Sequence, residues 1–121
     1  MRGLTSAGYV TPTPVQAQVI PLAMDGADLL VSALTGSGKT AAFLLPVMQR
    51  LLDVPKSRGG TRALVLVPTR ELARQIQEHF LRLAGFTRLS AGVITGGESK
   101  AHQIARLRKN PEILIATPGR L

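Results

Sequence analysis

Short apolar runs alternate along the chain with segments in which apolar residues recur every three or four positions. The runs at 28–33, 62–67, 90–95 and 113–116 predict buried strands. The helical patterns lie at 39–53, 72–84 and 100–108, with a kink expected at Pro46 in the first of them. Alternating strands and helices, with strands buried on both faces, predict an α/β fold: a doubly wound parallel sheet with helices on both faces.

The helix at 72–84 has the clearest amphipathic pattern. Its apolar face is formed by Leu72, Ala73, Ile76, Phe80, Leu83 and Ala84. Gly85 follows as a candidate C-cap, because glycine tolerates the backbone conformation that ends many helices. The segment 54–60 combines proline, glycine and charge and predicts a loop.

Composition sets limits on what the chain can be. Its 121 residues, 45% of them hydrophobic, suffice for one domain with a core but not for two. Cysteine is absent, which excludes disulfides and thiolate metal sites. The longest apolar stretch, 41–48, is too short to span a bilayer, and the first residues lack the apolar core of a signal peptide. We therefore expect a cytoplasmic protein without a membrane partner.

The charge is strongly basic, with 15 Lys and Arg against 7 Asp and Glu. Such an excess favours a polyanionic partner, although charge alone does not separate that interpretation from chance. One Tyr, three Phe and no Trp leave few side chains on which bases could stack. A nucleic acid would therefore be bound mainly through its backbone.

A glycine-rich loop joins the first predicted strand to the first long helix. It reads Ala33-Leu34-Thr35-Gly36-Ser37-Gly38-Lys39-Thr40. Glycines let successive N–H groups turn inward around phosphate oxygens, and the helix N-terminus adds partial positive charge. This context predicts a P-loop in which Lys39 reaches the β- and γ-phosphates and Thr40 ligates Mg²⁺. The nucleotide and Mg²⁺ are thus the expected cofactors.

Hydrolysis needs an acidic residue at the C-terminal end of a hydrophobic strand, and none is visible. Asp28 and Glu112 lie at the N-terminal ends of their predicted strands, and the other acids fall in helices or loops. The chain is therefore expected to stop before the Walker B strand. Because that strand would be missing from the sheet, we expect the isolated chain to be poorly stable.

Four further segments resemble the DEAD-box RNA helicases, in the order and spacing of that family. They are Gly8 to Gln16 for the Q motif, Pro68 to Ala73 for motif Ia, Gly96-Gly97 for the GG motif and Thr117 to Leu121 for motif Ib. The loop at 33–40 is similar to motif I, with Leu34 where the family usually has Gln. A particular similarity to bacterial helicases of ribosome assembly is also expected.

This resemblance implies an incomplete RecA-like domain of the P-loop NTPase class. Residues 1–26 would form the Q-motif region and 27–121 the N-terminal part of the ATP-binding domain. The implied ATP-binding residues are Tyr9, Thr11, Pro14, Gln16, Thr35, Gly36, Ser37, Gly38, Lys39 and Thr40, with Lys39 and Thr40 catalytic. Gln16 would read the adenine edge through its amide, while Thr13 to Gln16 also predicts a helix capping box. Both roles stay open.

The resemblance also implies an RNA site at the C-terminal ends of the strands. Its residues would be Pro68, Thr69, Arg70, Gly96, Gly97, Thr117, Pro118, Gly119 and Arg120. Thr69 is a predicted N-cap, so phosphate could meet a helix N-terminus there, with Arg70 adding charge. Contacts of this kind ignore base identity and predict steep salt dependence.

Three functional hypotheses follow. The first is an ATP-dependent RNA helicase that couples hydrolysis to local duplex unwinding, with this fragment inactive alone. The second is another P-loop class, such as a kinase or GTPase, and the third is an ATP- and RNA-binding fragment without catalysis. A preference for ATP over GTP that depends on Gln16 distinguishes the first from the second.

Overall fold

The computed structural model describes residues 13–32, 38–54, 61–85, 87–96, 99–109 and 111–119. In chain order the elements are α2 (Pro14–Met24), α3 (Lys39–Asp53), β1 (Ala63–Leu66), α4 (Arg70–Leu83), β2 (Ala91–Ile94), α5 (Lys100–Arg108) and β3 (Ile113–Ala116). The helices predicted at 39–53 and 100–108 are confirmed with the same bounds, as is the strand at 113–116. The strands predicted at 62–67 and 90–95 are confirmed one residue shorter at each end.

The three strands form a parallel sheet in the order β1-β3-β2. Ala116 at the end of β3 is level with Leu66 of β1 and with Ile94 of β2. All three strands therefore end at one edge of the sheet, and the loops that follow them meet there.

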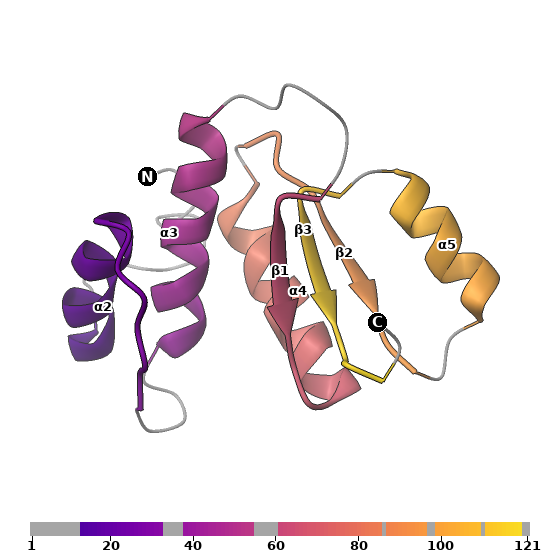
Figure 1. Ribbon diagram of the computed structural model, residues 1–121, viewed down its shortest axis with the longest axis horizontal. Helices are drawn as coiled ribbons and strands as arrows, with labels where there is room; N and C mark the ends of the chain where they lie inside the picture. The colour runs from indigo at the N-terminus through magenta and orange to yellow at the C-terminus, as the bar shows by residue number, and fades with distance from the viewer. Residues whose placement is uncertain are drawn as a thin grey trace.

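Helices lie on both sides of this sheet. The chain crosses from β1 to β2 in one direction and returns from β2 to β3 in the other, so right-handed crossovers place α4 and α5 on opposite faces. In Figure 1, α4 lies behind the strands, α5 lies beside β2, and α2 packs along α3. This arrangement confirms the predicted doubly wound α/β architecture.

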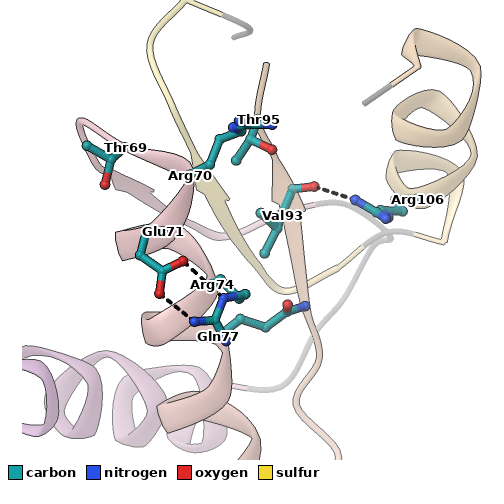
Figure 2. Close-up of a pocket in the computed structure, with 8 residues that line it drawn as sticks. All are labelled: Thr69, Arg70, Glu71, Arg74, Gln77, Val93, Thr95 and Arg106. Atoms are coloured by element: carbon teal, nitrogen blue, oxygen red, sulfur yellow. Dashed lines mark hydrogen bonds and ion pairs between the residues drawn. The ribbon is translucent and has the colours of Figure 1, made fainter. Parts of the chain in front are cut away.

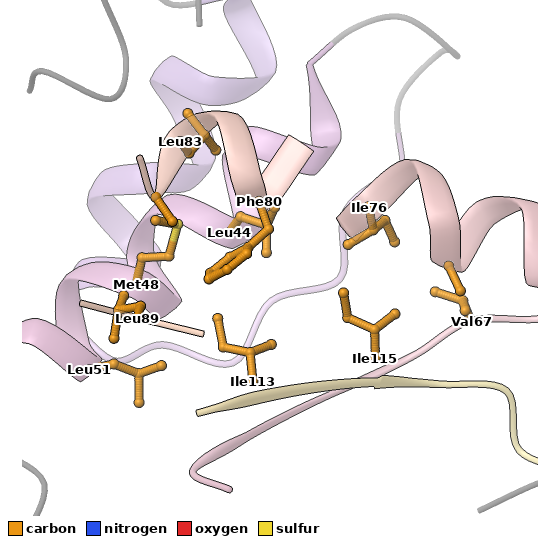
Figure 3. Close-up of a cluster of buried hydrophobic side chains, with 12 residues drawn as sticks. Leu44, Met48, Leu51, Val67, Ile76, Phe80, Leu83, Leu89, Ile113 and Ile115 are labelled. Atoms are coloured by element: carbon orange, nitrogen blue, oxygen red, sulfur yellow. The ribbon is translucent and has the colours of Figure 1, made fainter. Parts of the chain in front are cut away.

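The main core lies between α3, α4 and one face of the sheet. Phe80, Leu44, Ile113 and Ile115 are the largest fully buried side chains (Figure 3). The alternate residues of β3, Leu114 and Ala116, are buried on the other face. Burial on both faces explains why β3 has a continuous apolar run rather than an alternating pattern.

The amphipathic pattern of α4 correctly predicts its buried side. Ala73, Ile76, Phe80 and Leu83 are all buried. The C-cap prediction is wrong by one residue, because Ala84 ends the helix and its N–H donates to the Phe80 carbonyl. Gly85 lies just beyond and does not adopt a left-handed backbone, so no glycine is required there.

The predicted strand at 28–33 is not formed in its described part, residues 28–32. These residues have no regular structure, and the side chains of Leu29, Leu30 and Val31 are exposed. A strand needs a neighbouring backbone to satisfy its polar groups, and this segment pairs with none of the three described strands. The outer face of β1 is also open, with Leu64 and Leu66 more than half exposed.

Candidate nucleotide and nucleic-acid sites

The N-terminus of α3 differs from the other described helix starts. Hydroxyl side chains cap α2, α4 and α5: Thr13, Thr69 and Ser99 each accept a hydrogen bond from a backbone N–H of the first turn. The N-cap of α3 is Gly38, and no side-chain cap bond is made there. The first N–H groups of a helix need an acceptor from outside the helix, so this end suits an anion such as phosphate.

Gly38 has a backbone conformation that favours glycine, with φ of 90°. A Cβ at this position would lie 2.5 Å from Gln16 Nε2 and 2.8 Å from Thr13 Oγ1. The start of α2 therefore packs directly against the end of the predicted P-loop. No larger residue fits without displacing one of these side chains.

Gln16 joins the two segments through its side-chain amide. Its Oε1 accepts from the Thr13 backbone N–H at 3.0 Å, and its Nε2 donates to the Gly38 carbonyl at 3.2 Å. The residue is 3% exposed. The predicted capping box is thus confirmed, and an amide retains one further N–H and one oxygen lone pair. Reading of an adenine edge by these remaining groups stays a prediction.

Of the other residues predicted at the nucleotide site, the structure describes Pro14, Lys39 and Thr40. Lys39 and Pro14 are exposed, whereas Thr40 is half-buried in the first turn of α3. Tyr9, Thr11, Thr35, Gly36 and Ser37 lie outside the described residues.

The predicted RNA-binding residues that are described gather along the edge where the strands end. The Val67 N–H donates to the Ala116 carbonyl at 2.9 Å, and the Thr117 N–H donates to the Ile94 carbonyl at 3.0 Å. These two bonds continue the pairing of the strands by one residue, so the loops that follow β1, β2 and β3 begin at the same height of the sheet. The exposed residues in those loops include Pro68, Thr69, Arg70, Pro118 and Gly119, while Thr117 and Gly96 are half-buried. Gly97 and Arg120 lie outside the described residues.

A cavity of about 600 Å³ opens between α4 and β2 (Figure 2). Its lining comprises Thr69, Arg70, Glu71, Arg74, Gln77, Val93, Thr95 and Arg106. The sequence identified only Thr69 and Arg70 of this set. Thr95 could have been noticed because it directly precedes Gly96, but nothing in the sequence indicates that Arg106 reaches the cavity from α5.

Two of the cavity's cations are engaged in contacts within the protein. Arg74 forms ion pairs with Glu71 and with Glu78 Oε1, the latter at 2.5 Å. Hydrogen bonding to Arg74 and its charge lower the pKa of Glu71, and the carboxylates raise the pKa of Arg74. Arg106 Nη1 donates to the Val93 carbonyl at 3.1 Å. Arg70 has no ion pair with another described residue and is exposed at the rim, which favours it for an incoming phosphate.

The described ranges contain neither a membrane-spanning helix nor a cluster of metal ligands. No helix there is long and apolar enough to cross a membrane. Within the same ranges, no group of three or more His, Asp or Glu side chains gathers to hold a metal ion. The predicted Mg²⁺ ligand is a single Thr40 hydroxyl beside an anion site, which fits a metal bound largely through phosphate and water.

Comparison with known proteins agrees with this geometry. The family model of the DEAD/DEAH box helicases matches residues 13–121. The chain is 53% identical over 121 residues to DEAD-box ATP-dependent RNA helicase 28 of Arabidopsis thaliana, covering 100% of this chain and 15% of that protein. It is 50% identical over 121 residues to the probable ATP-dependent RNA helicase ddx27 of Dictyostelium discoideum, covering 100% of this chain and 16% of that protein.

A solved structure extends the similarity to three dimensions. The hypothetical ATP-dependent RNA helicase from Sulfolobus tokodaii superposes with a TM-score of 0.86 at 36% identity. The match covers 98% of this chain and 33% of that one. This chain thus spans 15% and 16% of the length of the two curated relatives named above. On the family match and these identities, the chain belongs to the DEAD/DEAH box helicase family.

Proposed function

We propose that this chain supplies the ATP-binding and part of the RNA-binding surface of an ATP-dependent RNA helicase. The observation that carries the proposal is the start of α3, which lacks a side-chain cap and lies against the buried amide of Gln16. An anion-binding helix end beside an amide that can read a base edge suits a nucleoside triphosphate.

In this proposal Lys39 and Thr40 act on the phosphates and their metal. The Lys39 ammonium would neutralise charge on the β- and γ-phosphates, and the Thr40 hydroxyl would help to hold Mg²⁺. Gln16 selects adenine with its remaining amide donor and acceptor, and Pro14 lines the same side of the base. Bound Mg²⁺ supplies charge neutralisation at the phosphates.

Among the described residues, no acid provides a hydrolytic carboxylate at the C-terminal end of a strand. Glu112 precedes β3 and is paired with Arg62 at 2.7 Å, while Glu71 and Glu78 are paired with Arg74. We therefore propose that hydrolysis and duplex unwinding require parts of the protein beyond this segment. The relatives' much greater length supports this division.

RNA is proposed to lie along the strand-end edge, contacting Thr69, Arg70, Gly96 and the 117–119 turn through its phosphates. The contacts come from backbone amides, a hydroxyl and an arginine, none of which reads a base. Binding should thus be independent of sequence and weaken steeply with salt. A cytoplasmic location and the bacterial ribosome-assembly subtype remain predictions.

The nucleotide half of the proposal is tested by calorimetric titration of ATP·Mg²⁺ and GTP·Mg²⁺ into the chain. We expect ATP to bind more tightly than GTP, and Lys39→Ala to abolish binding of both. Lys100→Ala removes the same charge from the exposed start of α5 and should bind like the wild type. Gln16→Ala should remove the preference for ATP. Equal affinity for the two nucleotides in the wild type would refute the adenine site.

The RNA half is tested by fluorescence anisotropy with labelled single-stranded RNA. Arg70→Ala should weaken binding about three- to tenfold, as expected for one charge-assisted phosphate contact. Arg82→Ala is the matched control, because it removes an exposed arginine from the other end of the same helix. Equal losses in the two variants would show that only net charge matters and that the edge is not a site.

A further inference from the structure

β2 is an outer strand of the described sheet, so half of its carbonyl groups face no described strand. The carbonyls of Ser90 and Ile94 accept from the Ile113 and Thr117 N–H groups and therefore point toward β3. Carbonyl directions alternate along a strand. The carbonyls of Val93 and Thr95 must consequently point to the open edge.

Two side chains of α5 satisfy these edge carbonyls. Gln103 Nε2 donates to the Thr95 carbonyl, and Arg106 Nη1 donates to the Val93 carbonyl at 3.1 Å. Figure 2 shows the Arg106 contact reaching across to β2. Because residues three apart lie on the same face of a helix, one face of α5 binds two alternate carbonyls of the strand. The contact fixes α5 along the edge of β2 and blocks pairing there with another strand.

Gln103 is the more informative of the two side chains. The residue is 2% exposed, and its Oε1 is the buried side-chain atom that has no hydrogen-bond partner among the described residues. An unsatisfied buried oxygen reduces stability, so the burial of this amide is explained by its donor and not by its acceptor. What glutamine adds is a neutral donor aimed at the Thr95 carbonyl.

The Thr95 carbonyl is the start of the short connection to α5. Gly96 follows directly, and a Cβ built there would meet no atom within 4 Å, so another backbone can approach closely. At the far end of the connection, the Ser99 hydroxyl caps α5 by accepting from the His102 N–H at 3.2 Å. The Gln103 side chain therefore fixes Thr95, the first residue of the connection, against α5, and the N-cap Ser99 at the other end belongs to the same helix.

We propose that Gln103 is a positioning residue for the RNA contact at Gly96: its amide fixes the Thr95 carbonyl and thereby the direction of the peptide that follows. Gln103 does not itself touch RNA. This inference rests on the proposed RNA site at the strand-end edge, and it adds a buried residue of α5 on which that site depends.

The test replaces Gln103 with methionine, which has similar length and no donor. Gln49→Met is the matched control, because Gln49 is exposed and loses one hydrogen bond, that from Nε2 to Asp53 Oδ1 at 2.8 Å. Amide hydrogen exchange of a peptide covering residues 93–99 reports positioning, and anisotropy with labelled oligouridylate reports RNA binding. ATP titration checks the nucleotide site.

In Gln103→Met we expect faster exchange at 95–99, with exchange in α4 unchanged, and RNA affinity lower by about three- to tenfold. ATP affinity should match the wild type, and Gln49→Met should match it in every assay. Unchanged exchange at 95–99, or faster exchange with unaltered RNA affinity, overturns the inference and leaves the RNA site standing. Faster exchange throughout α4 as well would indicate a general loss of stability and also overturns it. If the wild-type chain binds no RNA, the proposed function fails together with the inference.

Discussion

The contact between Gln16 and Gly38 makes a quantitative prediction for a double-mutant cycle. In Gly38→Ala the alanine must adopt a φ of 90°, and its Cβ would lie 2.5 Å from Gln16 Nε2. The left-handed backbone costs an alanine about 1–2 kcal/mol. Displacing Gln16 breaks its bonds to the Thr13 N–H and the Gly38 carbonyl, each worth about 0.5–1.5 kcal/mol.

Gly38→Ala should therefore lower the free energy of unfolding by about 2–5 kcal/mol, the sum of the backbone strain and the two lost bonds. Gln16→Ala alone loses the same two bonds and should cost about 1–3 kcal/mol. Once Gln16 is truncated, Gly38→Ala still adds the backbone strain and the close contact of its Cβ with Thr13 Oγ1 at 2.8 Å, but the two Gln16 bonds are not lost a second time. The two substitutions should thus be coupled by about 1–3 kcal/mol.

The assay is urea denaturation of the four proteins, followed by circular dichroism without nucleotide. Gly85→Ala is a suitable control, because that glycine has no positive φ and its nearest neighbours to a new Cβ lie 3.9 Å away. It should change stability by less than about 0.5 kcal/mol. If the costs of Gly38→Ala and Gln16→Ala add to within about 0.5 kcal/mol, the two residues do not interact as described.

Three further predictions concern stability. Arg62 donates from Nε and Nη2 to Glu112 Oε2, and also to the Leu51 carbonyl at the end of α3. Arg62→Met should therefore lower the free energy of unfolding in urea by about 2–4 kcal/mol. The double variant Arg62→Met/Glu112→Gln should lose less, and a larger loss in the double variant would contradict this. Burial and the charge of Arg82 lower the pKa of His79 from 6.5 in the folded chain. As the pH falls below 6.5, the unfolded chain therefore binds this proton more readily than the folded chain, and thermal stability should fall. This fall should vanish in His79→Gln. With Leu30 exposed, the isolated chain should be poorly stable, and a cooperative thermal transition well above room temperature would disprove that.

The sequence predicts α3, α4, α5 and the central strand of this fold well, because their signals are local; of α2 it predicts the start, through the capping box, but not the extent. The capping hydroxyls of Thr13 and Thr69 and the apolar period of α4 act within one turn of the residues they control. The apolar run at 28–33 predicts burial but does not specify a partner strand. Its described part therefore has no regular structure and is exposed, with Leu30 the most exposed of its side chains.

The sites show the same limit. The sequence identifies Gln16 and Gly38 separately, but only the fold shows that the amide of one binds the carbonyl of the other. Arg106 and Gln103 carry no recognisable motif, since their role comes from the open edge of β2, which depends on strand order. Contacts set by topology are not encoded within a short window of sequence.

The starts of α3 and α4 are capped differently, and this difference predicts different binding of the two proposed ligands. At α4 the Thr69 hydroxyl already accepts from the Leu72 N–H at 3.1 Å, so an RNA phosphate there finds fewer amides to satisfy and depends more on Arg70. At α3 no side chain caps the helix, so the phosphate of the proposed nucleotide would supply the acceptor that the first turn lacks. Nucleotide binding should therefore stabilise α3 and, through the Gly38 carbonyl and Gln16, the start of α2. RNA binding should be weaker and more sensitive to salt.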